Sequence, residues 1–142
     1  MITPQQIEKI RQSWGKLIAF SSKLSAAHYQ KLFEKYPDYQ NLFHFTDMKK
    51  QKFQLSGAIA LMVAKLEKLE DLEKDFKYFA KRHLDRGINP QDFLPFGQVL
   101  LESIGEVLGK EWTPEVRDSW QALYDTIAKA ITKSMEEWKK AS

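Results

Sequence analysis

The chain has 142 residues, of which 43% are hydrophobic and 29% charged, a balance typical of a globular domain rather than a disordered segment. The formal net charge is only +3, and lysine is interleaved with glutamate, as in residues 65–70. This interleaving is typical of solvated helix faces and argues against a nucleic-acid-binding surface.

Cysteine is absent, which excludes disulfides, thiolate metal sites and thioether-attached cofactors. The first residues lack the basic and apolar regions of a signal peptide. The longest apolar run, residues 58–64, is far shorter than the roughly 20 residues that span a bilayer. We therefore expect a cytoplasmic protein with no membrane segment, folded as one domain over residues 1–142.

Helix signals recur along the whole chain, and no strand pattern of convincing length is visible. Thr3 before Pro4, with Gln6 three residues after the threonine, predicts a helix start with a capping box. The apolar face expected for this first helix consists of Ile7, Ile10, Trp14 and Leu17.

The next two helices have candidate caps and a proline boundary. Ser21 and Ser22 are candidate caps for a second helix, which Pro37 ends. That proline can also open a short helical turn through residue 43. Thr46 or Asp47 is expected to cap a long helix that follows.

The stretch around His83 predicts a helix with one apolar face that ends near Gly87, a favourable C-terminal cap. Apolar residues precede the histidine at steps of three and four, which place them on one side of a helix. They are Phe79, Phe76 and Leu72. An imidazole at the end of such a stripe could hold a flat apolar ligand that carries a metal, or it could be a hydrogen-bonded core residue.

Two further helices complete the chain. Asn89 and Pro90 predict the start of one, Gly109 its end, and Thr113 with Pro114 the start of the last. The apolar face expected for the last helix consists of Val116, Trp120, Leu123, Ile127, Ile131 and Trp138. The sequence therefore predicts an all-α domain of seven to eight helices.

Several segments in this order resemble the globin family, over the whole chain. They are Tyr36-Pro37 at the end of the second helix, Leu42-Phe43 after the short turn, Arg82-His83 with Gly87-Ile88, the segment around Phe93, and Trp120 to Tyr124. The likeness is greatest to bacterial single-domain haemoglobins and to the globin halves of flavohaemoglobins. It implies a globin fold around a pocket for haem b. The aromatic content of 13% suits such a pocket, and equally an ordinary core.

The resemblance also implies roles for individual residues. His83 corresponds to the proximal haem ligand, and the family's spacing places Gln51 on the distal side, with Leu55 one turn further on. Tyr29 corresponds to the pocket tyrosine of the second helix, and Phe43 to the phenylalanine that packs on the porphyrin. The other haem contacts that we expect are Phe79, Arg82, Ile88, Phe93 and Ile127.

The chemistry of these residues fits the implied function. A neutral imidazole donates its Nε2 lone pair to iron while its other nitrogen is held, here by the expected Phe79 carbonyl. One axial histidine leaves a position open to O₂, and the Tyr29 hydroxyl and Gln51 amide can both donate hydrogen bonds to it. Each such bond is worth roughly 1.5–3 kcal/mol, which predicts slow release and high affinity. Arg82 and Arg86 could meet the haem propionates or lie on the surface.

Other interpretations of the polar pocket residues stay open. Tyr29 could be a core tyrosine with a backbone partner, and Gln51 could point to solvent. We expect His28 at the surface or between helices and His44 at the surface. A sharper alternative is that His44 ligates the iron when no gas is bound.

Three functions are compatible with the resemblance: reversible O₂ binding for scavenging or storage, nitric oxide dioxygenation, and gas sensing. Flavohaemoglobins continue into FAD- and NAD-binding domains, whereas this chain ends at Ser142, so turnover would need a separate reductase. They also brace the proximal histidine with a tyrosine and a glutamate. Here Phe93 replaces the tyrosine and Met135 stands near the glutamate position, with Glu136 one residue away. We therefore expect O₂ binding, with NO and CO as further ligands, and NO dioxygenation as the alternative.

Overall fold

The computed structural model describes residues 2–141, so Met1 and Ser142, the ends of the expected domain, lie outside the described residues. These residues contain no strand, and their α-helices are α1 (Pro4–Leu17), α2 (Ser21–Lys35), α3 (Met48–Ala64), α4 (Glu73–Asp85), α5 (Phe93–Leu108) and α6 (Pro114–Ala141). Short 3₁₀ segments join them: η1 (Ile18–Phe20), η2 (Pro37–Phe43), η3 (Leu69–Leu72), η4 (Pro90–Asp92) and η5 (Gly109–Glu111). The predicted all-α class is confirmed. The count of seven to eight helices was high because the shortest helical segments are 3₁₀ turns.

Most helix starts follow the predicted local chemistry. The Thr3 hydroxyl accepts from the backbone of Gln6, whose side chain accepts from the Thr3 backbone, so the capping box is present. The Asp47 carboxylate caps α3 by accepting from the backbone of Lys49 at 3.0 Å. Asn89 forms a reciprocal box at the start of η4. These caps satisfy backbone donors that the first turn of a helix leaves unpaired.

The predicted caps at Ser21 and Ser22 are wrong. The N-cap of α2 is Phe20, and it makes no side-chain capping bond. The chain leaves α1 through η1 with helical dihedral angles at Ile18, so it turns into α2 without the extended residue that a side-chain cap requires.

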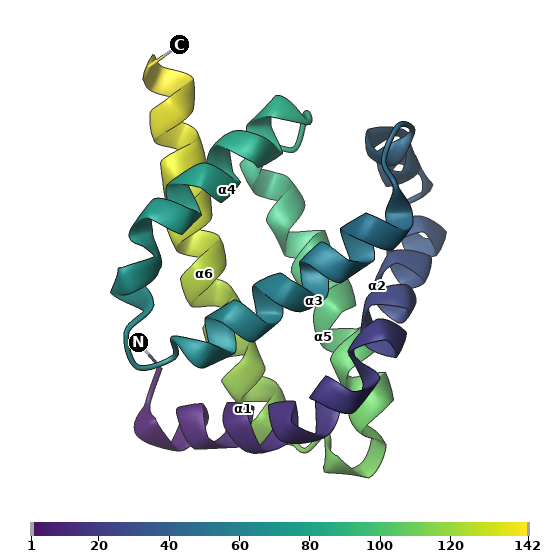
Figure 1. Cartoon of the computed structure of the whole chain (residues 1–142), viewed down its shortest axis with the longest axis vertical. Helices are drawn as coiled ribbons and strands as arrows, with labels where there is room; N and C mark the ends of the chain where they lie inside the picture. The colour runs from purple at the N-terminus through teal and green to yellow at the C-terminus, as the bar shows by residue number, and fades with distance from the viewer. Residues whose placement is uncertain (1, 142) are drawn as a thin grey trace.

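The helices pack in crossed pairs rather than as a parallel bundle (Figure 1). In this view α3 runs across α5 and α6, while α1 crosses the lower part of α6. Helix α2 packs on α3 and α5, and α4 packs on α6. The buried residues form three apolar clusters, one around α1, α5 and α6, one between α4 and α6, and one between α2 and α5.

The end of α6 departs from the predicted apolar face. Trp138 is 41% exposed, and Lys81 Nζ lies 6.0 Å from the centre of its ring. Met135 is the last fully buried side chain of the helix, and the remaining turns extend beyond the apolar cluster. Among residues 2–141, no helix combines the length and apolar character needed to cross a membrane.

Candidate functional site

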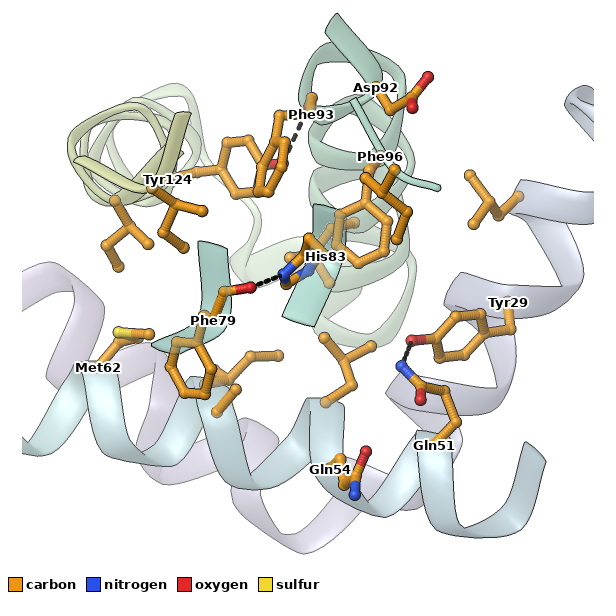
Figure 2. A pocket seen from close by; sticks show the side chains of 18 of the residues that line it. Tyr29, Gln51, Gln54, Met62, Phe79, His83, Asp92, Phe93, Phe96 and Tyr124 are labelled. Atoms are coloured by element: carbon orange, nitrogen blue, oxygen red, sulfur yellow. Dashed lines mark hydrogen bonds between the residues drawn. The ribbon is translucent and has the colours of Figure 1, made fainter. Parts of the chain in front are cut away.

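An apolar cavity of about 450 Å³ lies between α3 on one side and α4, α5 and α6 on the other, with α2 and η2 closing one end. All ten residues predicted for the site line it: Tyr29, Phe43, Gln51, Leu55, Phe79, Arg82, His83, Ile88, Phe93 and Ile127. Residues far apart in the sequence therefore meet around one space (Figure 2).

His83 enters the cavity from α4, and the structure fixes which of its nitrogens is free. Its Nδ1 lies 2.5 Å from the Phe79 carbonyl oxygen, one helical turn earlier, as expected (Figure 2). Burial lowers the pKa of His83, the Phe79 carbonyl opposes this, and the charges of Arg86 and Arg82 lower it further. The imidazole is therefore neutral, with Nδ1 as donor and the Nε2 lone pair left for a ligand.

The surroundings of His83 on the α5 and α6 side are apolar. The ring of Phe93 lies 5.3 Å from the imidazole, centre to centre. Met135 is fully buried in the cluster that contains Phe76 and Ala80, whereas Glu136 is exposed. Within residues 2–141, no carboxylate contributes to the pKa shift of His83. The histidine thus lacks an acidic brace.

A close contact between α5 and α6 holds Phe93 in place. The Tyr124 hydroxyl donates to the Phe93 carbonyl oxygen at 2.6 Å (Figure 2). The Tyr124 ring crosses α5 at Gly97, where an added Cβ would lie 2.2 Å from Tyr124 Cε2. Glycine at this position therefore lets the tyrosine approach the α5 backbone.

Tyr29 and Gln51 approach the cavity from α2 and α3 and bind each other. Gln51 Nε2 donates to the Tyr29 hydroxyl at 3.0 Å (Figure 2). Gln51 Oε1 accepts from Arg86 Nη1 at 3.1 Å. Burial raises the pKa of Tyr29, while the Gln51 hydrogen bond and the Arg86 charge oppose that shift. Tyr29 therefore has a side-chain partner rather than a backbone one, and Gln51 points inward.

A polar hollow of about 510 Å³ adjoins the apolar cavity, and we call it the mouth. Residues that line both spaces are Leu42, Gln51, Gln54, Arg82 and Arg86. His44 is exposed and lines the mouth, not the apolar cavity. The mouth thus combines cationic side chains with an opening to the apolar interior.

His28 is buried more deeply than the sequence suggested. It lies between helices, which was one of the two expected positions. Its side chain has no exposed surface, and neither ring nitrogen has a hydrogen-bond partner. Its ring lies 4.3 Å from that of Phe96 and 4.9 Å from that of Tyr29. Burial lowers the pKa of His28 to about 3. The side chain is therefore a neutral part of the packing behind Tyr29.

Some cavity residues were not predicted for the site. Phe96 follows Phe93 by three positions and shares its helix face, a spacing that could have identified it. Gln54 stands in the same relation to Gln51. No local signal marks Asp92, which accepts from the Tyr39 hydroxyl at 2.9 Å across the end of the cavity.

The cavity residues fit a haem group. Folded interiors contain few voids larger than a water molecule, and a hollow of about 450 Å³ is in the range of cofactor sites. Its walls are mainly aliphatic and aromatic, its one imidazole has a free Nε2, and arginines lie at the polar mouth. A large planar apolar group with a metal and carboxylates matches these three features.

Comparisons with known proteins agree with this arrangement. The Globin family profile matches residues 26–131. The flavohemoprotein of Bacillus subtilis is 29% identical over 142 aligned positions, which cover 96% of this chain and 36% of that protein. A globin-like protein of Aquifex aeolicus is 28% identical, with 92% of each chain covered. The chain belongs to the globin family.

Solved structures show the same fold. An engineered carbene transferase from Rhodothermus marinus, derived from a candidate nitric oxide dioxygenase, aligns with a TM-score of 0.91 and 22% identity, covering 99% of this chain and 98% of that one. A bacterial globin from Campylobacter jejuni aligns with a TM-score of 0.87 and 22% identity, covering 97% and 99%. The chain is thus a haem-binding globin by family, and it spans about a third of the Bacillus subtilis flavohemoprotein.

Proposed function

We propose that this chain is a haem b protein that binds O₂ reversibly and with high affinity. The observation that carries the proposal is the pairing of His83, whose Nε2 is free, with the hydrogen-bonded Tyr29 and Gln51 across one apolar cavity. When bound, haem supplies an iron with one open position for a diatomic gas. NO and CO are further ligands that such a site accepts.

On the proximal side, His83 is the proposed iron ligand. The Phe79 carbonyl orients the imidazole and fixes the tautomer that presents Nε2. Phe43, Leu55, Phe79, Ile88, Phe93 and Ile127 are the proposed apolar haem contacts. Arg82, at the mouth, is the proposed partner of the haem carboxylates.

On the distal side, the hydrogen-bond directions make Tyr29 the proposed donor to the ligand. Gln51 Nε2 already donates to the Tyr29 oxygen, so the hydroxyl proton is free to point elsewhere. A hydrogen bond to a ligand that carries negative charge is worth roughly 1.5–3 kcal/mol, which slows ligand release. The apolar walls exclude water, which strengthens that bond.

The test is an absorption spectrum of the purified protein reconstituted with haem b, recorded in the ferric, ferrous and oxygenated states. We expect an intense Soret band, and a reversible spectral change when O₂ is added to and removed from the ferrous protein. Stopped-flow displacement of O₂ by CO then gives the dissociation rate. A protein that retains no haem, or whose ferrous form does not bind O₂, would refute the proposal.

Nitric oxide dioxygenation is the second candidate, favoured by the likeness to flavohemoproteins. The reaction joins NO and O₂ and takes up one electron to give nitrate, so turnover would need a reductase that supplies this electron. The apolar surroundings of His83, with Met135 buried and Glu136 exposed, lack the acidic brace that favours such electron-rich chemistry. We therefore rank it below O₂ binding.

The two candidates differ in what happens when NO meets the oxygenated protein. A dioxygenase with a reductase present yields nitrate over many turnovers, whereas an O₂ carrier reacts once and stops in the ferric form. Nitrate analysis after repeated additions of NO, with and without a flavin reductase and NADH, separates them.

A further inference from the structure

Arg86 connects the helix of His83 with the distal pair, a role that neither the family nor the proposed function assigns. It follows α4 directly, and its backbone N–H donates to the carbonyls of Arg82 and His83 at 3.3 and 3.2 Å. Gly87 then takes a positive φ of 84°, and the N–H of Ile88 returns to the His83 carbonyl at 3.0 Å. The backbone at Arg86 is therefore tied to the backbone of the proximal histidine.

The side chain of Arg86 reaches from this cap to α3. Its Nη1 donates to Gln51 Oε1 at 3.1 Å, and Gln51 Nε2 donates in turn to the Tyr29 hydroxyl at 3.0 Å. A guanidinium has donors only, so it selects the oxygen end of the amide. The NH₂ end must then face Tyr29.

This order of donors determines what the Tyr29 hydroxyl can do. If the Gln51 amide were reversed, its oxygen would accept the Tyr29 proton and the hydroxyl could not donate to a ligand. With the amide held as it is, the hydroxyl accepts from Gln51 and keeps its own proton for a partner in the cavity. Among residues 2–141, no hydrogen bond uses that proton, and Tyr29 lines the cavity. Burial raises the pKa of Tyr29, and the Arg86 charge opposes part of that rise.

We propose that Arg86 is a positioning residue for ligand binding: it holds the Gln51 amide so that Tyr29 donates into the cavity. The proposal rests on the proposed O₂-binding function. It also implies that the cap after α4, next to the proximal histidine, helps set the rate at which the distal side releases its ligand.

The test compares two substitutions that each remove one positive charge from the mouth. Arg86→Met removes the donor to Gln51. Lys50→Met is the matched control, because Lys50 precedes Gln51 in α3 and lines the same mouth, while its side chain has no hydrogen bond to the pair. We expect Arg86→Met to speed O₂ dissociation about threefold to tenfold, the effect of one ordinary hydrogen bond, and Lys50→Met to change it less than twofold.

A double-mutant cycle shows whether Arg86 acts through Gln51. In a Gln51→Met background, Arg86→Met should change O₂ dissociation less than twofold, because its partner is already gone. An undiminished effect in that background would overturn the proposal. So would equal effects of Arg86→Met and Lys50→Met, which would mean that only the charge matters.

Two spectroscopic readouts are independent of gas release. In the CO-saturated protein, the C–O stretching frequency reports the hydrogen bond at the ligand, and it should shift in Arg86→Met but not in Lys50→Met. In NMR spectra of the same form, the Gln51 side-chain NH₂ should show a contact with the Tyr29 ring that Arg86→Met weakens. If Arg86→Met speeds haem loss while both signals and O₂ dissociation stay unchanged, Arg86 serves the haem carboxylates and the proposal fails.

The proposal and the proposed function fail in different ways. A protein without haem or O₂ binding refutes both. A protein in which Tyr29→Phe speeds O₂ release while Arg86→Met does not retains the O₂-binding function and refutes only the role of Arg86.

Discussion

The two sides of the cavity are built by different means. On the α4 side, His83 is held by a backbone carbonyl of its own helix and by apolar packing. On the α2 and α3 side, Tyr29 and Gln51 hold each other through side chains, and the chain of bonds ends at the exposed Arg86. The first arrangement resists change because it is local and half-buried. The second can be tuned by single polar substitutions.

Breaking the proximal side should have the largest effect. Among residues 2–141, His83 is the only imidazole that lines the cavity, so we expect His83→Ala to lose stable haem retention. The measurement is the Soret absorbance after gel filtration of the reconstituted protein. His44→Ala is the control, because His44 lies at the exposed mouth and should leave haem retention unchanged. Full haem retention by His83→Ala would contradict the assignment.

Removing the distal hydrogen-bond donor should leave haem bound but speed the release of the gas. Tyr29→Phe removes the proposed donor at nearly constant volume, so O₂ dissociation should become about 10- to 100-fold faster. The rate is measured by CO displacement in a stopped-flow instrument. Tyr78→Phe, on the exposed face of α4, should leave the rate unchanged. If Tyr29→Phe left the O₂ dissociation rate unchanged, Tyr29 would not donate a hydrogen bond to the ligand.

The packing that supports the proximal side can be tested without haem chemistry. Gly97→Ala places a methyl group where the Tyr124 ring lies, and overpacking of this kind lowers the free energy of unfolding by about 1–3 kcal/mol. Denaturant titration measures the loss. Gly15→Ala in α1 is the matched control, because nothing lies within 4 Å of its added Cβ, so we expect no loss or a gain of up to about 1 kcal/mol. Equal free energies of unfolding for the two variants would show that the Tyr124 side chain can move to accommodate the added methyl group.

The buried His28, which packs behind Tyr29 on the distal side, should make the free energy of unfolding depend on pH. Its pKa is about 3 in the folded protein, against an ordinary value of 6.5, so below pH 6.5 the unfolded chain takes up a proton that the folded chain refuses. The neutral, buried His28 therefore contributes its full stabilisation of the folded state above pH 6.5, and this contribution is lost as the pH falls. The free energy of unfolding should decrease by about 1.4 kcal/mol between pH 7.5 and 5.5 for this reason.

His28→Leu should abolish this part of the pH dependence. The measurement is the difference in unfolding free energy between the two proteins at pH 7.5 and 5.5, in which the other titrating groups cancel. A difference that does not change with pH would mean that His28 stays accessible to protons in the folded state.

Local chemistry explains which features of the fold were predictable from the sequence. The caps at Thr3, Asp47 and Asn89 depend on residues two or three positions apart, and they formed as expected. The expected cap at Ser21 failed because the path from α1 into α2 is set by packing between helices. Ser21 is the right residue type, but its own backbone is helical, and Phe20, the N-cap, is not extended, with φ −118° and ψ 22°.

In the site, too, contacts within one helix were predictable and contacts between helices were not. The helical spacing of Phe79 and His83 predicted their hydrogen bond, because four residues make one turn. The resemblance to globins predicted Tyr29 and Gln51 as pocket residues but left open which atom donates to which. That depends on Arg86, which is 35 positions from Gln51 in the sequence. The burial of His28 likewise depends on Phe96 of α5 and left no local signal.

The apolar position of Met135 has a consequence for electron transfer. A carboxylate bonded to an axial histidine pushes negative charge toward the iron and stabilises its oxidised state. With a buried thioether in that region instead, the ferrous state is easier to reach, so we expect a comparatively high reduction potential. A weakly reducing donor would then be sufficient to keep the haem iron of this globin in the ferrous state.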